Sequence, residues 1–142
     1  MALVGGGGAG NVAGGSASST GTSLNYVGSH VYAYSSAFSA DTNIANTTAL
    51  KFSTGSEYIV GTMTLNPCLE VSSVDIAGTF MRIKLNDEQV AMAFTGNASV
   101  DAPGSAIINL ILPPFTQVLV EVWADSTDAG DLGNVQFIGR IY

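Results

Sequence analysis

Three carboxylates in one short segment have the spacing best suited to chemistry in this sequence. Asp125, Asp128 and Asp131 fall within seven residues that also include Ser, Thr and Gly. Calcium prefers several oxygen ligands from such a loop, although the spacing is not that of an EF-hand. The segment is therefore a candidate Ca²⁺ site, with an acidic surface turn as the alternative. The sequence points to no other cofactor.

The other reactive side chains lack the partners that catalysis needs. His30 is the single histidine, so the residues needed for a zinc hydrolase site or for a histidine-containing catalytic triad are missing. Cys68 is the single cysteine, which excludes a disulfide within these residues and is typical of a small buried hydrophobic residue. The GGGGAG segment at residues 5–10 has no strand before it and no helix after it, unlike a dinucleotide-binding loop. We expect a protein that is not an enzyme.

Charge and composition narrow the classes of partner. The chain of 142 residues has a net charge of −7 and only four basic residues, too few for a DNA or RNA partner. Charged residues make up 11% of the chain, against about 25% in an average soluble protein. Such a neutral surface is typical of protein contact areas. The longest apolar run, Ala106–Leu112, is too short to span a bilayer, and residues 1–15 do not resemble a signal peptide, so no membrane partner is expected.

The elements that must position these residues begin after a glycine-rich segment. Residues 1–29 contain nine glycines, four alanines and no charged residue. So few large apolar side chains cannot offset the entropy cost of ordering the segment, so we expect an N-terminal arm followed by one domain over residues 30–142. Leu3 and Val4 are candidate anchors of this arm in a partner. The alternative is a flexible tail.

Residues 30–142 predict β-structure throughout, because Thr, Val, Ile, Tyr and Phe are frequent and turn residues recur between them. The expected strands are His30–Ala40, Thr48–Ser53, Glu57–Leu65, Thr79–Leu85, Gln89–Phe94, Ala106–Leu112, Thr116–Ala124 and Asn134–Tyr142. Alternation predicts these inward residues: Ile59, Met63, Leu65, Met81, Ile83, Leu85, Val90, Met92, Phe94, Val118, Val120, Val122, Val135, Phe137 and Ile141. Gly61 is expected at a close approach.

Two segments carry further expectations. A turn at residues 86–88 joins two strands into a hairpin, which leaves Arg82 and Lys84 on the solvent face. Ala106–Leu112 is mostly apolar, so we expect it to be buried on both sides or covered by a neighbour.

Seven or eight strands around one core predict an all-β, antiparallel two-sheet sandwich. The Cys–Trp–Cys pattern and tyrosine corner of immunoglobulin domains are missing, which favours a jelly-roll-like sandwich. Phe80, Leu119 and Trp123 are expected on faces turned away from the core. They are candidate interface residues, because aromatic side chains often dominate interface energy.

Three segments carry a resemblance to a known group: FMRIKLNDEQVAMAF, INLILPPFTQVLVEVW and NVQFIGRIY. The stretch from Asn46 to Tyr142 resembles small single jelly-roll structural proteins of viruses, especially those on the capsids of tailed phages from aquatic settings. The resemblance implies a non-enzymatic decoration or cement subunit, often a homotrimer, that binds the major capsid protein on the outer surface of the virion.

A second class of function stays open. Jelly rolls also serve as carbohydrate- or receptor-binding modules of a virion surface or fibre. Exposed Trp123, Tyr32 and Tyr34 would then form the site, together with calcium at residues 125–131. A pilus or surface-layer subunit would share the arm but needs an export signal.

Overall fold

The computed structural model describes residues 21–36, 38–39, 47–68, 75–76, 79–95, 98–99, 104–124 and 132–142. These residues form an all-β antiparallel sandwich, as the sequence predicts, and they hold no membrane-spanning helix. The strands are β1 (Asn25–Val27), β2 (His30–Tyr34), β3 (Phe38–Ser39), β4 (Thr47–Ser53), β5 (Ile59–Cys68), β6 (Asp75–Ile76), β7 (Thr79–Leu85), β8 (Glu88–Phe94), β9 (Ala98–Ser99), β10 (Ala106–Leu112), β11 (Gln117–Ala124) and β12 (Leu132–Ile141).

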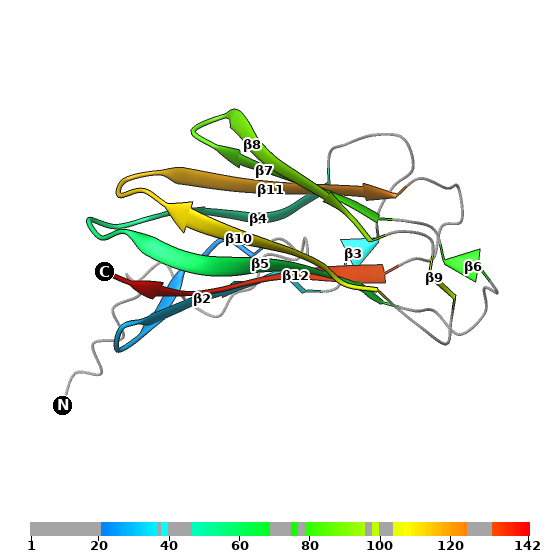
Figure 1. The fold of residues 1–142 in the computed structure, drawn as a ribbon, viewed down its shortest axis with the longest axis horizontal. Helices are drawn as coiled ribbons and strands as arrows, with labels where there is room; N and C mark the ends of the chain where they lie inside the picture. The colour runs from blue at the N-terminus through cyan, green and yellow to red at the C-terminus, as the bar shows by residue number, and fades with distance from the viewer. Residues whose placement is uncertain are drawn as a thin grey trace.

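Two sheets form the layers of the sandwich (Figure 1). The larger sheet has the order β1-β2-β12-β5-β10, with β3 also paired to β12, and the smaller sheet has the order β4-β11-β7-β8. If β2, β4, β5, β7, β8, β10, β11 and β12 are counted as strands one to eight, the sheets read 1-8-3-6 and 2-7-4-5. This is the strand order of a jelly roll.

A single apolar core fills the space between the two sheets. Every second residue of β5, β7, β11 and β12 points into it, because side chains alternate between the faces of a strand. The largest fully buried side chains are Phe137, Leu50, Ile59, Met63, Leu65, Met81, Ile83, Leu112, Val31, Val118, Val120 and Val122. The predicted inward faces of these four strands are therefore confirmed, with Leu85 and Ile141 only partly buried at the rim.

The β7–β8 turn has two residues instead of the three expected. Leu85 pairs with Glu88 across it, and Asn86 and Asp87 have positive φ angles of 49° and 69°. Both angles match the type I′ turn that suits the twist of a hairpin. The side-chain carbonyl of Asn86 accepts a hydrogen bond from the Gln117 backbone N–H at 2.9 Å, which ties the turn to β11.

The predicted inward positions of Val90, Met92 and Phe94 were wrong, because β8 contains a bulge. A two-residue turn alone would place Val90 opposite Ile83, but the pairing shifts by one residue so that Ile83 faces Ala91. One extra residue moves every later side chain to the other face. Val90, Met92 and Phe94 are therefore exposed, and two alanines pack against the core instead, Ala91 and Ala93.

Strand β10 is exposed on one face, so the expectation that Ala106–Leu112 is buried on both sides was wrong. It lies at the end of the larger sheet and pairs only with β5 among the described residues. Ile107 and Ile111 are 63% and 64% exposed on its outer face, whereas Ile108 and Leu110 pack partly against the core. The strand is apolar on both faces although one face is open to solvent.

The opposite side of the sandwich is closed by the chain that precedes β1. Gly21 pairs with β4 through its backbone, receiving a hydrogen bond from Lys51 and donating one to Ala49. A Cβ at Gly21 would clash with the carbonyl oxygen of Tyr34, so only glycine fits between β4 and β2. Leu24 is buried in the core. Residues from Gly21 to Val27, which the sequence assigns to the arm, therefore take part in the sandwich.

Candidate interaction surfaces

A row of aromatic side chains crosses the outer face of the smaller sheet. Phe80 of β7 lies directly opposite Phe94 of β8 on one side and Trp123 of β11 on the other. The ring centroids of Phe80 and Phe94 are 4.4 Å apart, and those of Phe80 and Trp123 are 5.1 Å apart with an interplanar angle of 8°. We call these three residues the aromatic ladder. Its β8 end is open, because Phe94 and the neighbouring Met92 are 44% and 58% exposed.

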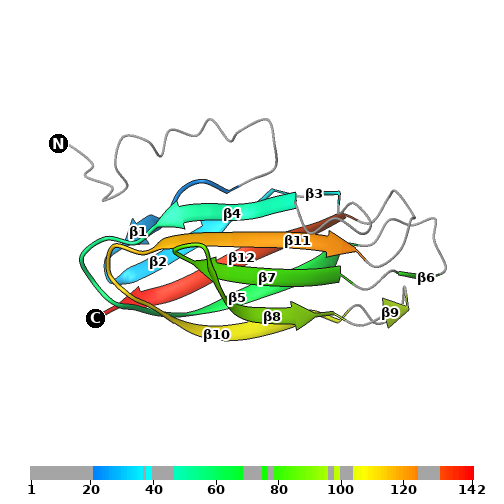
Figure 2. The same cartoon turned by 90° about the horizontal axis from the view of Figure 1, so that it is seen from above.

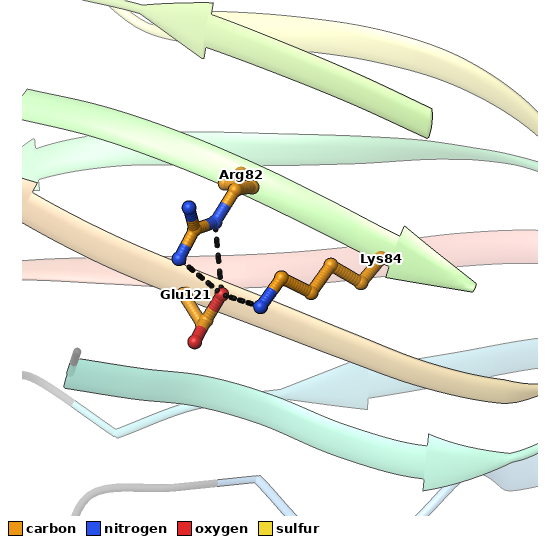
Figure 3. Close-up of polar contacts among 3 residues, drawn as sticks. All are labelled: Arg82, Lys84 and Glu121. Carbon is orange, nitrogen blue, oxygen red and sulfur yellow. Dashed lines mark hydrogen bonds and ion pairs between the residues drawn. The ribbon is translucent and has the colours of Figure 1, made fainter. Parts of the chain in front are cut away.

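An ion triad of Arg82, Lys84 and Glu121, drawn in Figure 3, lies on the same face as the aromatic ladder, where Arg82 contacts Trp123. Oε2 of Glu121 on β11 forms ion pairs with the Arg82 guanidinium at 2.8 Å and with the Lys84 ammonium group at 3.0 Å. The Glu121 side chain is 12% exposed and each cation is 24% exposed, so the three charges are largely withdrawn from water. The Arg82 guanidinium also lies over the Trp123 ring at 5.6 Å. The triad therefore holds the Trp123 end of the ladder in place.

Part of this surface was predicted from the sequence. Phe80, Leu119 and Trp123 lie on the outer face as expected, and all three are half-buried. Leu119 stands opposite Lys84 of the ion triad and two positions before Glu121 on β11. Phe94 and Met92 were missed, because only the β8 bulge turns them outward. Alternation gave no signal for this bulge, because it favours the larger Val90, Met92 and Phe94 over the alanines as buried residues.

The outer face of the larger sheet has a different chemistry. Among the described residues, its strands turn no Asp or Glu outward, although the whole chain carries eleven acidic residues. The face presents His30 opposite Arg140, and a tyrosine pair, Tyr32 and Tyr34, whose ring centroids are 5.1 Å apart. Its remaining outward residues are mostly Thr, Asn, Gln, Val and Ile. His30 is exposed there as a surface residue.

The tyrosine pair and Trp123 do not share a surface. Tyr32 and Tyr34 belong to β2 of the larger sheet, and Trp123 belongs to β11 of the smaller sheet. The two sheets face one another across the core, so their outer faces point in opposite directions (Figures 1 and 2). A single carbohydrate site therefore does not include both the tyrosine pair and Trp123.

A projecting phenylalanine marks the turn between β10 and β11. Phe115 is 77% exposed and has a φ of +52°, a backbone conformation that is unfavourable for a bulky residue. The Thr54 hydroxyl fixes this turn, donating to the Pro113 carbonyl at 2.7 Å and accepting from the Thr116 N–H at 2.8 Å. The Phe115 N–H donates to the Gly55 carbonyl at 2.8 Å. Side-chain burial does not account for this strained conformation.

Several candidate residues lie outside the described part of the chain. These are the arm residues Leu3 and Val4 and the proposed calcium ligands Asp125, Asp128 and Asp131. Within the described residues, no three His, Cys, Asp or Glu side chains come together as metal ligands.

No protein-family model matches this chain, and no curated protein sequence matches it.

Proposed function

We propose that this protein is a non-enzymatic structural subunit that decorates the outer surface of a viral capsid. The observation that carries the proposal is the aromatic ladder with its open end at Phe94 and Met92. Large aromatic side chains on a rigid sheet are typical anchors of protein–protein interfaces, and a patch of this kind is uncommon on a protein that stays alone in solution.

The capsid setting is supported by the jelly-roll strand order and by the viral resemblance of the segment from Asn46 to Tyr142. The net charge of −7 suits a position outside the shell, because a protein that lines a packaged genome needs basic residues. In this proposal the aromatic ladder contacts the major capsid protein. The arm at residues 1–20 adds a second contact, with Leu3 and Val4 as its anchors.

Attachment of the purified protein to capsids that lack it tests the proposal. Trp123→Ala removes the largest ring of the ladder, so we expect binding to capsids to weaken by about tenfold or more. Tyr34→Ala is the matched control, because it removes an exposed aromatic residue from the opposite face. Cosedimentation with capsids measures both variants. Equal binding by Trp123→Ala and the unchanged protein would contradict the role of this face.

A carbohydrate-binding function is favoured by one specific observation, the Tyr32–Tyr34 pair on the larger sheet. Adjacent tyrosine rings offer a flat apolar surface with polar tips, and the Gln136 side chain lies opposite Tyr34. Saturable binding of a glycan by the protein, lost in Tyr34→Ala and kept in Trp123→Ala, would support this function over capsid attachment.

A further inference from the structure

Strand β10 has an open backbone edge. It pairs with β5 from Ala106↔Leu65 to Leu112↔Ile59, and no described residue pairs with its other edge. An exposed edge of this kind is a template for another strand, and proteins usually protect it with charged residues, proline or a covering segment. The sequence of β10, AIINLIL, contains no charged residue and no proline.

The side chains of β10 also lack the cover that such an apolar strand normally has. Ile107 and Ile111 are exposed on the outer face, while Ile108 and Leu110 only partly reach the core at the side of the sandwich. Figure 2 shows β10 and β8 running along this same side of the molecule. A further strand beside β10 would cover apolar surface on both faces.

The sequence of β10 is nearly symmetric about Asn109. Ile108 and Leu110 flank the asparagine, and Ile107 and Ile111 follow on either side. In an antiparallel pair of two identical strands with Asn109 at the centre, Ile107 of one copy faces Ile111 of the other. Ile108 faces Leu110 in the same way. The five central residues then meet partners of similar size and polarity on the same face of the sheet, whereas Ala106 faces Leu112 at the two ends.

The charge distribution allows two copies to meet at this edge. Like charges usually keep acidic proteins apart, and this chain has a net charge of −7. The described outer face beside β10 carries no carboxylate, and the outward side chains of β5 that pair with it are Val60, Thr62 and Thr64. The Thr62 hydroxyl donates to the Asn109 side-chain oxygen at 3.0 Å, which leaves the Asn109 amide N–H₂ group available at the centre of the pair.

We propose that two copies of this protein form a two-fold dimer by antiparallel pairing of their β10 strands, centred on Asn109. The dimer joins the two larger sheets into one continuous sheet. The aromatic ladder lies on the outer face of the smaller sheet and takes no part in this strand pairing. A two-fold dimer also differs from the homotrimer that the viral resemblance implies, so a mass measurement distinguishes the two assemblies.

A cross-linking experiment tests the register of the pair. In a Cys68→Ser background, Asn109→Cys places two thiols directly opposite one another, where Cβ atoms of paired strands are about 4.5–5.5 Å apart. We expect mild oxidation to convert most of this variant into a covalent dimer. Ile111→Cys alone should stay monomeric on a denaturing gel, because its partner is Ile107, whereas Ile107→Cys combined with Ile111→Cys should cross-link.

Measurement of the molecular mass in solution tests the same edge in variants that carry no cysteine substitution. Ile107→Lys combined with Ile111→Lys places charges at the seam, and we expect dimerisation to weaken by at least about 100-fold. Ile138→Lys is the control, since it alters a 48% exposed isoleucine on β12, away from the edge on the same face. Unchanged circular dichroism and a cooperative thermal melt show that each variant folds.

Three outcomes overturn the proposal. The unchanged protein is a monomer or a trimer by light scattering at high concentration, Asn109→Cys does not cross-link to itself, or the Ile138→Lys control dissociates as readily as the edge variant. A failed capsid-binding test for Trp123→Ala does not affect this proposal, because the ladder and β10 lie on different sheets.

Discussion

The two sheets of the sandwich are stabilised in different ways. On the smaller sheet, side chains fix one another, since the aromatic ladder and the ion triad meet at Trp123. On the larger sheet, the main chain provides the fit. Gly61 and Gly139 stand opposite one another at its centre, and the Phe137 ring lies close to both. A face built from interlocked side chains is preordered for binding, whereas the larger sheet offers a partner the backbone of its edge.

Among the variants that test this difference, Gly61→Ala should cause the largest loss of stability. An added Cβ would lie 2.6 Å from Cζ of Phe137 and 2.7 Å from the carbonyl oxygen of Ile138. We expect Gly61→Ala to lower the free energy of unfolding by about 3 kcal/mol, because both neighbours must move. Gly55→Ala is the control, since its nearest neighbour is the Tyr26 hydroxyl at 3.7 Å. Equal urea midpoints for the two variants would contradict a main-chain fit in the larger sheet.

Removal of the Glu121 charge tests the side-chain arrangement of the smaller sheet. Glu121→Gln keeps the shape but leaves Arg82 and Lys84 without their shared carboxylate. We expect a loss of about 1.5 kcal/mol in the free energy of unfolding, which shrinks at high salt because screening weakens the ion pairs. Glu57→Gln, at an exposed loop, is the control. Denaturation in low and high salt measures both, and a loss unaffected by salt would argue against an ionic contribution.

The smallest expected effect concerns the turn that presents Phe115. Glycine adopts a positive φ without steric cost, so Phe115→Gly should raise the free energy of unfolding by about 1 kcal/mol. Phe115→Ala keeps the Cβ and the strain, and it should gain little. Thermal melts distinguish these variants. A destabilised Phe115→Gly would show that the ring contributes to the fold, which its exposure does not suggest.

Much of the fold follows from short-range sequence patterns. Strict alternation in β5, β7 and β11 predicts their buried residues, because the two-residue period of a strand fixes which side chains share a face. The missing immunoglobulin signals correctly favour a jelly roll. The three-residue strand β1 was not predicted, because its Asn-Tyr-Val sequence follows a Gly- and Ser-rich segment that resembles a linker.

The surfaces were harder to predict, because they depend on pairing between distant strands. One bulge residue, Val90, reverses the face of β8 and brings Phe94 to the aromatic ladder. The sequence predicts that Trp123 and Tyr34 are both exposed aromatic residues, but it does not show that they lie on different sheets. Alternation shows that a residue leaves the core, but it does not show on which side of the molecule that residue emerges.

The central position of β12 has a consequence for the order of events during folding. β12 lies between β2 and β5, and the Val135 N–H donates to the Ser35 hydroxyl 100 residues earlier in the sequence. During translation, β2 and β5 leave the ribosome well before the strand that joins them. The edges of β2 and β5 that pair with β12 therefore stay unpaired in the nascent chain until β12 has been synthesised. Contacts at such long sequence separation make folding slow, and the waiting strands are the point at which a nascent chain is most exposed to aggregation.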